Sequence, residues 1–513
     1  MRPFLPALAV ILASCTASGG SPGTPSVPPF DGKVPPATCP APVQLRDTSS
    51  PSAVVGTGTA ASCTEDALRA AAQKTNSAGG GIITFRCGAG PVTITVGSQI
   101  VFTRETVLDG GGQVTLSGGD SSRILYLDSG YDQTTPRLWV QRLRFESGKS
   151  ARAGDDTASG GAAIYRDGGS LTVVDCVFLG NHAPSSGQDL AGGAIYAFGG
   201  GDTVIVGSTF VGNSASDGGA VGSLNGHLTV VNSTFTENQA LGTGGNPGLG
   251  GCGGAIYQDG GDEVTTLCGV TIRNNSAGAT AGGVFRVSNS HDGTMTLELS
   301  TVDGNSVTAS GDGGAGGLYL EGLDLTVNRS TVSRNAAFYN GGMWISRGTI
   351  DLVDTTIAGN TATGSNGGGL WLSYSPRGRI LNCTIADNHA PGGSAGAIFN
   401  AGPQVSGQPV LQNTVLSGND ARWSDACQEV AGEELGDGGG NLEWTADGTR
   451  CAAAATVADP LLSALGDHGG PTETMLPGAT SPARQLAKSG CPTVDQRNQP
   501  RTTPCTAGAV EAP

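Results

Sequence analysis

Hydrophobic and polar residues alternate in a short segment that recurs through the middle of the chain. One copy, Gly192 to Asn213, reads GGAIYAFGGGDTVIVGSTFVGN, and about nine recognisable versions lie between residues 160 and 420. The intervals between the asparagines that close the copies run from 25 to 37 residues, which indicates one structural turn per copy with loops of variable length. These asparagines are Asn181, Asn213, Asn238, Asn275, Asn305, Asn335, Asn360, Asn388 and Asn419.

The residues before each asparagine predict a strand. Four positions upstream stands mostly threonine, and three positions upstream is always apolar, so the side chains alternate with a period of two. Copies stack best as parallel strands about 4.8 Å apart, with the asparagines forming an amide ladder at the turn. The pattern therefore predicts a parallel β-helix. The apolar column consists of Phe178, Phe210, Phe235, Ile272, Val302, Val332, Ile357, Ile385 and Leu416.

A pair of adjacent glycines stands in most copies ahead of a short apolar run. Glycine permits the positive φ and the close backbone approach that a tight β-helix corner requires. Copies differ in length mainly between the asparagine and this pair, for example at Gly242–Gly251, which predicts loops along one edge of the solenoid. The pairs begin at Gly192, Gly218, Gly253, Gly282, Gly316, Gly341 and Gly368.

The composition agrees with a large all-β solenoid. The 513 residues include 86 Gly, and only 5% are aromatic and 14% charged, as expected for a core of stacked small and β-branched side chains. The formal net charge of −16 disfavours nucleic acid and anionic membrane surfaces as partners of the surface as a whole.

The first 15 residues, MRPFLPALAVILASC, combine a basic start, an apolar stretch and the tetrapeptide Leu-Ala-Ser-Cys. This resembles a bacterial lipoprotein signal with its lipobox, which implies that Cys15 is lipidated and begins the mature chain. The apolar stretch is too short to cross a bilayer as a permanent helix. The resemblance predicts an exported protein of the cell envelope, held by its lipid at the outer membrane or cell surface. An ordinary cleaved secretory peptide is the alternative.

The rest of the chain divides into four parts. Residues 16–62, rich in Pro, Ser, Thr and Gly, predict a flexible tether. Residues 63–137 open with a helical pattern and short strands, an order that resembles the N-terminal cap of bacterial right-handed β-helix proteins. A terminal repeat must cover its apolar cross-section, so a capping helix is expected there. The regular repeats then occupy 138–420, and a C-terminal module occupies 421–513.

Twelve cysteines in an exported chain favour disulfides. Cys176 and Cys383 stand in a column that elsewhere holds Ser, which indicates buried small residues, and Cys39 has no obvious partner. The pairs predicted from their short spacing are Cys63 with Cys87, Cys252 with Cys268, Cys427 with Cys451, and Cys491 with Cys505.

Two parts of the chain resemble known families. Beyond Asp459 stand Asp459-Pro460-Leu461-Leu462, Gly469-Gly470-Pro471-Thr472 and Asp495-Gln496-Arg497, which resemble the C-terminal module of bacterial choice-of-anchor Q surface proteins. The elements Phe-x-x-Asn and Gly-Gly-Ala-Ile resemble the repeats of chlamydial polymorphic outer membrane proteins. Both resemblances imply an all-β, right-handed parallel β-helix, the pectin-lyase-like fold, at the cell surface. They imply little about chemistry.

No catalytic constellation is evident in the sequence. Glycoside hydrolysis needs two positioned carboxylates, and the ordered Asn-Thr-Asp, Asp-Asp, Gly-His-Gly and Arg-x-Lys set that resembles the pectin-hydrolase signature is missing. Lys149 is the one lysine of the array, and His182 and His389 each follow a ladder asparagine, as turn residues do. The arginines of the array, Arg273, Arg334, Arg347 and Arg379, look scattered, with no carboxylate cluster in register.

Aspartates in Gly-rich loops could supply oxygen ligands to Ca²⁺, although solvated turn residues explain them as well. These are Asp189, Asp217, Asp259, Asp262, Asp292 and Asp312.

One aromatic strip stands out. Two residues beyond the Gly pair, successive copies carry Phe285, Tyr319, Trp344 and Trp371. If the apolar residues that flank the last three face the core, the aromatics face outward as a flat stack suited to a sugar ring or a partner protein. The opposite phase buries the stack, and Arg286 beside Phe285 favours that phase in its own copy.

These features predict a lipid-anchored, surface-exposed and non-catalytic β-helix, an adhesin or a scaffold that binds a glycan or a protein. The prediction includes no catalytic residue, metal or cofactor, leaving Ca²⁺ open, and expects a monomer that contacts the membrane through its lipid, with no nucleic-acid partner. The alternative is a polysaccharide lyase or glycoside hydrolase of the pectin-lyase-like fold, with its site in the irregular loops.

Overall fold

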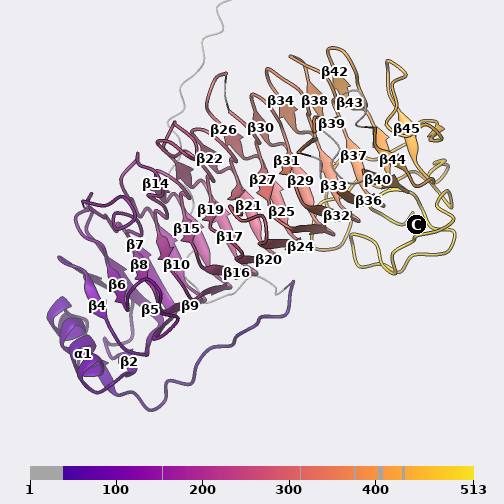
Figure 1. The fold of residues 1–513 in the computed structure, drawn as a ribbon. Coiled ribbons are helices and arrows are strands. Elements are labelled where there is room, and N and C mark those ends of the chain that lie inside the picture. The colour runs from indigo at the N-terminus through magenta and orange to yellow at the C-terminus, as the bar shows by residue number, and fades with distance from the viewer. Residues whose placement is uncertain are drawn as a thin grey trace, which may run out of the picture.

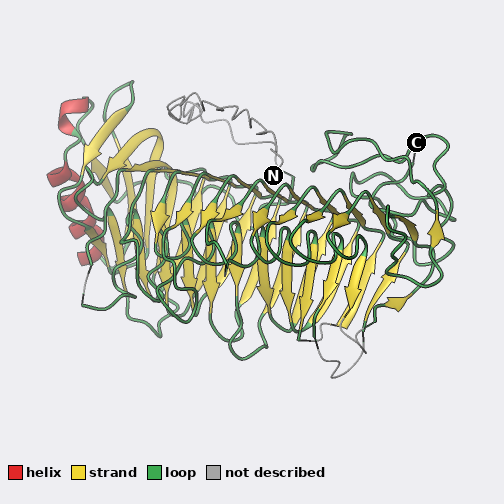
Figure 2. Cartoon of the chain, turned by 90° about the horizontal axis from the view of Figure 1, so that it is seen from above, coloured by secondary structure: helices red, strands yellow, loops and turns green. Residues whose placement is uncertain are grey.

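The computed structural model describes residues 38–152, 154–311, 313–374, 377–402, 408–429 and 434–512. Its strands stack in parallel along one axis, with a helix at one end and the C-terminal loops at the other (Figures 1 and 2). Three sheets of 26, 12 and 8 strands run along this axis. The fold is a parallel β-helix, as predicted.

Each regular coil visits the sheets in a fixed order. It starts in the twelve-stranded sheet, continues into a first and then a second column of the 26-stranded sheet, and ends in the eight-stranded sheet. The first and second columns meet at a left-handed residue in most coils, for example Asp175 (φ 52°), Asn232 (φ 49°) and Arg329 (φ 47°). We call this line of turns the column corner.

The twelve-stranded sheet comprises β4 (Ile100–Phe102), β6 (Leu125–Asp128), β8 (Ile164–Asp167), β11 (Ile195–Phe198), β15 (Val221–Leu224), β19 (Ile256–Asp259), β23 (Val284–Arg286), β27 (Leu318–Glu321), β31 (Met343–Ser346), β35 (Leu370–Ser373), β39 (Ile398–Asn400) and β43 (Cys427–Glu429). The eight-stranded sheet comprises β14 (Ser214–Ala215), β18 (Gln239–Ala240), β22 (Ser276–Ala277), β26 (Ser306–Val307), β30 (Ala336–Ala337), β34 (Thr361–Ala362), β38 (His389–Ala390) and β42 (Asp420–Ala421).

The first column comprises β1 (Ala53–Val55), β2 (Gly81–Phe85), β9 (Ser170–Val174), β12 (Asp202–Val206), β16 (His227–Val231), β20 (Val264–Cys268), β24 (Thr294–Glu298), β28 (Asp324–Asn328), β32 (Thr349–Val353), β36 (Arg377–Leu381), β40 (Pro409–Gln412) and β44 (Gly436–Asp437). The second column comprises β3 (Val92–Thr95), β10 (Val177–Leu179), β13 (Thr209–Val211), β17 (Thr234–Thr236), β21 (Thr271–Arg273), β25 (Thr301–Asp303), β29 (Thr331–Ser333), β33 (Thr356–Ala358), β37 (Thr384–Ala386), β41 (Val415–Ser417), β45 (Leu442–Trp444) and β46 (Thr456–Val457). The long strands β5 (Thr106–Ser117) and β7 (Arg137–Glu146) pass through both columns.

The predicted asparagine ladder is present. The side-chain amide nitrogen of each asparagine from Asn181 to Asn388 donates to the side-chain oxygen of the next at 2.9–3.0 Å. The apolar column lies beside it in the core, where Phe178, Phe210 and Phe235 stack with ring centroids 4.6 Å apart. Buried amides and stacked rings thus fix the register of the coils.

A capping helix covers the N-terminal end, as expected. Helix α1 (Glu65–Ser77) follows the short 3-10 helix η1 (Ala60–Ser62) and begins at Thr64, whose side chain accepts a hydrogen bond from the Ala67 backbone nitrogen at 3.2 Å. Its buried face, which includes Leu68 and Ala71, packs over the end of the apolar core. No helix in the described ranges is long and apolar enough to cross a membrane.

The second half of the predicted tether differs from expectation. Residues 38–52, here called the N-terminal strap, run along the column corner from β20 back to β1 (Figure 1). The strap is fixed by a disulfide from Cys39 to Cys268 and by two hydrogen bonds. The Arg46 backbone nitrogen donates to the Gln141 side-chain oxygen at 2.9 Å, and the Thr48 hydroxyl donates to the Asp109 carboxylate at 2.6 Å. It is ordered because outward-facing apolar side chains need cover, namely Val107, Trp139, Val174, Val206 and Val231.

Residues 459–512 form a second cover, the C-terminal strap, over the rest of the corner. Gln496 donates to the Ser330 carbonyl at 3.1 Å, and Asn382 donates to the Thr506 carbonyl at 3.1 Å. The buried Arg501 guanidinium pairs with Asp354. Parallel pairing continues to β46, so the solenoid extends into the predicted C-terminal module before the strap folds back.

Three of the four predicted disulfides are present, linking Cys63 with Cys87, Cys427 with Cys451, and Cys491 with Cys505. The prediction that Cys252 pairs with Cys268 is wrong. Cys268 faces the strap and pairs with Cys39, whereas Cys252 is a buried free thiol. Cys176 and Cys383 are also buried and free, as predicted.

Candidate functional site

The aromatic residues of the twelve-stranded sheet form one column in register. From β6 to β39, each strand but β15 places an aromatic at the same position, and Gly222 interrupts the column there. The column contains Tyr126, Tyr165, Tyr196, Tyr257, Phe285, Tyr319, Trp344, Trp371 and Phe399.

The flanking residues fix the phase of this column. The neighbours of Tyr319, Trp344 and Trp371 within their strands are at most 1% exposed and belong to the core, so the aromatic rings project from the outer face of the sheet. The phase suggested by Arg286 is wrong. Its guanidinium lies inside the coil and donates to the carbonyls of Glu263 and Glu321 at 2.6 and 2.7 Å, while Phe285 faces outward.

Exposure along the column is uneven. Tyr196 and Tyr257 are fully buried, and Phe285 is 5% exposed. Tyr319, Trp344 and Trp371 are only partly buried. Tyr126, at the N-terminal end of the column, is also partly buried, but the longest run of partly exposed rings lies on the three successive strands β27, β31 and β35. We call Tyr319, Trp344 and Trp371 the open aromatic segment.

The rings of the open aromatic segment pack mostly on one another. Trp344 and Trp371 are stacked with centroids 5.0 Å apart, Tyr319 meets Trp344 edge-on at 5.5 Å, and Tyr339 meets Trp371 edge-on at 6.3 Å. The Trp344 indole nitrogen donates to Ser373 at 2.8 Å. The expected flat platform is thus a ladder that shows ring edges to solvent, because neighbouring rings cover much of each face.

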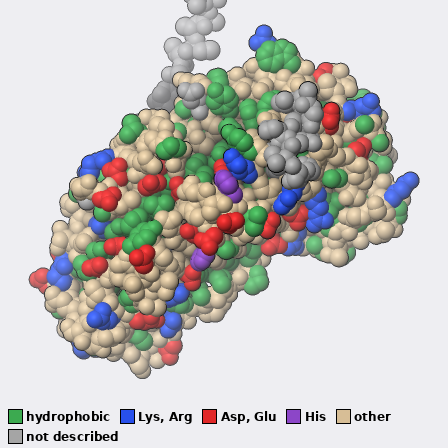
Figure 3. All heavy atoms as spheres, viewed as in Figure 1, with side chains coloured by type: hydrophobic (Ala, Val, Ile, Leu, Met, Phe, Trp, Pro, Cys, Tyr) green, Lys and Arg blue, Asp and Glu red, His purple; other side chains and the backbone are tan. Residues whose placement is uncertain are grey.

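Charged groups converge beside the open aromatic segment. The Glu321 carboxylate lies 3.0 Å from Nδ1 of His291, 3.7 Å from Nε of Arg347 and 3.4 Å from the Tyr319 hydroxyl. We call these four residues the Glu321 cluster. Figure 3 shows acidic, basic and histidine side chains close together near the centre of this face, with further charged side chains toward both ends.

The stacking of coils brings this cluster together. Glu321 ends β27 and pairs in register with Ser346, and Arg347 is the left-handed residue (φ 70°) that follows Ser346. His291 comes from the loop between β23 and β24, one coil earlier. The sequence interpretation of scattered arginines is therefore wrong, since the parallel register places Arg347 one coil from a carboxylate, and it does the same for Arg273 and Arg379.

The cluster presents donors toward solvent. The Arg347 guanidinium lies 4.8 Å from the ring centroid of Tyr374, which is 58% exposed, an arrangement that supports the cation by cation–π attraction. Within the described ranges, neither Nε2 of His291 nor the terminal nitrogens of Arg347 have a hydrogen-bond partner. Burial, and secondarily the Glu321 charge, raise the pKa of Tyr319 above its usual value, so its hydroxyl stays protonated. Such a surface can donate hydrogen bonds to hydroxyl or carboxylate oxygens.

The other arginines of the array form structural pairs. Arg273 and Arg334 both contact Asp303, at 2.9 and 2.6 Å, and Arg379 contacts Asp351 at 2.5 Å. His182 lies 2.8 Å from Ser214, and His389 contacts Asp420 one coil away. Both histidines occupy turn positions beside the ladder.

The loop aspartates are not all solvated. Asp217 and Asp259 are 1% and 5% exposed, and the Tyr257 hydroxyl lies 2.7 Å from Asp189 and 3.0 Å from Asp259. Burial is the main cause that raises the pKa of Asp217 well above its usual range, with Asp189 and Asp259 adding repulsion. Within the described residues no group of His, Cys, Asp and Glu could hold a metal ion; Asp312 lies outside them, whereas Asp262 and Asp292 are exposed.

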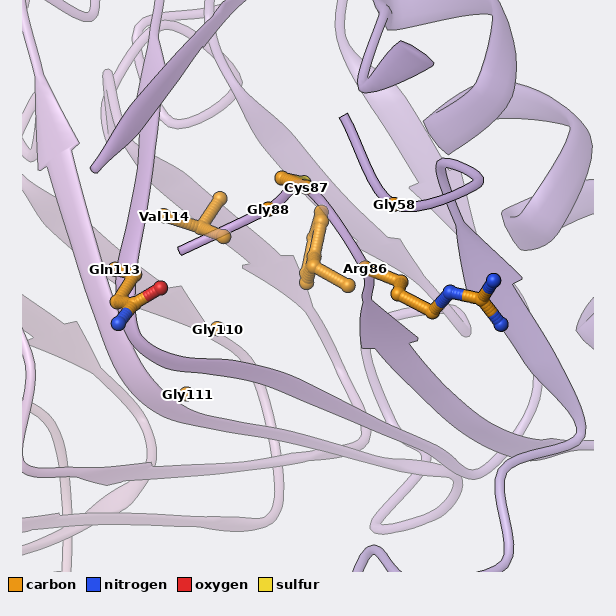
Figure 4. Close-up of a pocket in the computed structure, with 9 residues that line it drawn as sticks. Gly58, Arg86, Cys87, Gly88, Gly110, Gly111, Gln113 and Val114 are labelled. Atoms are coloured by element: carbon orange, nitrogen blue, oxygen red, sulfur yellow. The ribbon is translucent and has the colours of Figure 1, made fainter. Parts of the chain in front are cut away.

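Two recesses near the N-terminal cap lack a catalytic arrangement of described residues. One of about 340 Å³ is lined by nine residues, four of them glycines, and its Arg86 side chain extends away from Gln113 (Figure 4). A neighbouring recess of about 410 Å³ includes Asp109, whose carboxylate is held by Arg142, Thr48 and Gln141. The Asp109 carboxylate and the Arg142 guanidinium thus hold the N-terminal strap and the column corner in place, and neither is available as a catalytic acid or base.

Comparisons with known proteins leave the family open. No protein-family model matches the chain, and no curated protein matches it. Among solved structures, the A-module of mannuronan C-5 epimerase AlgE6 from Azotobacter vinelandii is similar, with 11% sequence identity over 74% of this chain and 94% of that one. The TM-score is 0.34, a likeness too low to carry a functional assignment.

Proposed function

We propose that this chain is an exported, lipid-anchored and non-catalytic β-helix that binds polysaccharide through the open aromatic segment and the Glu321 cluster. It would act as an adhesin or a glycan-binding scaffold at the cell surface. Cys15, the residue proposed to carry the lipid, lies outside the described residues.

One observation carries the proposal: partly exposed aromatic rings on three successive coils stand beside Nε2 of His291 and the terminal nitrogens of Arg347, donors that have no partner among the described residues. The exposed part of an aromatic ring face packs against the C–H surface of a sugar, and the donors would bind ring hydroxyls or carboxylates. The coils repeat about every 4.8 Å, so a long chain of sugar units could contact several coils at once.

A second candidate function is cleavage of the bound polysaccharide. The observation that favours it is the orientation of His291, whose Nδ1 faces the Glu321 carboxylate while Nε2 has no partner in the described part of the chain. A base oriented by a carboxylate is a recurring catalytic arrangement. The cluster is open on the surface rather than enclosed, which favours binding over catalysis.

A polysaccharide array tests both candidates. The mature chain would be applied to plant, algal and bacterial polysaccharides, and both retention and new reducing or unsaturated chain ends would be recorded. The proposal expects retention without new ends, lost in the double variant W344A/W371A. The matched control is W423A, which removes a tryptophan that is 61% exposed at another site. New chain ends abolished by H291A would replace the binding proposal with the catalytic one, and retention unaffected by W344A/W371A would contradict the assigned site.

A further inference from the structure

The N-terminal strap determines where the segment before Thr38, here called the leader, leaves the fold. Thr38 and Cys39 lie at β16 and β20, because Asn232 accepts hydrogen bonds from both backbone nitrogens at 3.0 and 2.9 Å and donates to the Cys39 carbonyl at 2.8 Å. The disulfide to Cys268 adds a covalent link across 229 residues. The chain before Thr38 must therefore start from this place, whatever path it takes.

This exit point is the middle of the solenoid. In the first column, six strand pairings lead from β2 to β20, and six more lead from β20 to β44. With neighbouring strands about 4.8 Å apart, each half is about 29 Å long. Without the strap, the leader would instead start beside β1, at the capped end.

We propose that the disulfide between Cys39 and Cys268 makes the β-helix lie side-on to the membrane, with the edge that carries the straps toward the lipid surface. The proposal rests on the lipid anchoring proposed above. An anchor at mid-length lets either end rise from the bilayer by at most half the solenoid length beyond the reach of the leader, whereas an anchor at the cap lets the far end rise by the whole length.

The consequence concerns the candidate site. The strap covers the column corner, at the end of the first-column strands, whereas the open aromatic segment lies on the twelve-stranded sheet that precedes them in each coil. A side-on molecule would thus keep the aromatic column parallel to the membrane plane and free of the lipid surface. A polysaccharide lying along the cell surface could then contact the whole row of coils.

Neutron reflectometry on a supported bilayer tests the orientation. The mature chain with Cys15→Ser and a histidine tag before residue 15 would be bound to nickel-chelating lipid, so the result does not depend on acylation. Lipidation itself is tested separately, by mass spectrometry of the protein exported from a bacterial host. The matched variant C39S/C268S/N232A, here called the unpinned variant, removes the disulfide and the hydrogen bonds that hold Thr38 and Cys39 at β16 and β20. Circular dichroism would verify that its β-helix is intact.

The side-on orientation predicts a protein layer clearly thinner than the solenoid length of about 58 Å, twelve spacings of 4.8 Å. The unpinned variant should give a thicker layer. A wild-type layer as thick as the solenoid is long would overturn the inference, and so would equal layers from the wild type and a folded unpinned variant.

Discussion

The asparagine ladder makes a strong prediction about stability. Asn305 lies in the middle of the ladder and is fully buried. Its side-chain oxygen accepts from the backbone and side-chain nitrogens of Asn275 at 2.9 Å each, and its amide donates to the Ile272 carbonyl and to Asn335 at 3.0 Å. Substitution with alanine removes four hydrogen bonds, each contributing about 1 kcal/mol net. We expect Asn305→Ala to lower the free energy of unfolding by about 4 kcal/mol.

Hydrogen exchange measured by mass spectrometry can resolve this loss locally, because a solenoid opens in sections. A loss of about 4 kcal/mol corresponds to roughly a thousandfold faster exchange in β21, β25 and β29. The control is Asn289→Ala, which removes one hydrogen bond of an exposed residue, to Asp259 at 2.7 Å. A loss below about 1 kcal/mol for Asn305→Ala, or a loss equal to that of the control, would refute the view that the ladder holds the coils together.

Three further predictions concern the strap, a buried acid and the core. Peptide mapping of the unreduced protein should recover Cys39 linked to Cys268, and recovery of Cys252 linked to Cys268 would contradict the strap. Asp217→Asn should stabilise the protein increasingly as the pH rises above about 4, since a carboxyl with a raised folded-state pKa costs stability once the same carboxyl is ionised in the unfolded chain. Urea unfolding of variant and wild type between pH 4 and 8 measures this difference. A difference in unfolding free energy that stays constant with pH would argue against the prediction. Phe210→Ala should lower the free energy of unfolding by about 3 to 5 kcal/mol in the same assay, because it opens a cavity between stacked rings. Phe210→Leu should lower it clearly less, and equal losses for the two variants would contradict a packed stack.

The repeat could be predicted from sequence because the same residues perform the same task in each coil. A buried asparagine between β-strands has few ways to satisfy its amide, so the ladder and its register followed from nine positions. The capping helix was predictable for a similar reason, because the open end of an apolar core needs cover.

The errors arise where distant segments meet. The pairing of Cys252 with Cys268 was inferred from short spacing, but Cys268 points outward to a strap whose low hydrophobicity resembles a tether. The signal that could have revealed the strap is the apolar outward residue at the end of three successive first-column strands, Val174, Val206 and Val231, together with a cysteine without a local partner.

The candidate site was predicted only in part. The sequence identified Tyr319, Trp344 and Trp371 but left their phase open, which the burial of Leu318 and Leu320 decides. The Glu321 cluster was missed, because its members belong to three coils and meet only through strand register and loop length.

The central claim, binding of polysaccharide at this face, is tested most directly by a hydrogen-exchange footprint. The mature chain would be compared with and without a polysaccharide retained on the array. The account predicts slower exchange confined to β27, β31, β35 and the loop that carries His291. Protection that spares these elements and falls instead near Trp423, Trp444 or the recess beside Arg86 would contradict it.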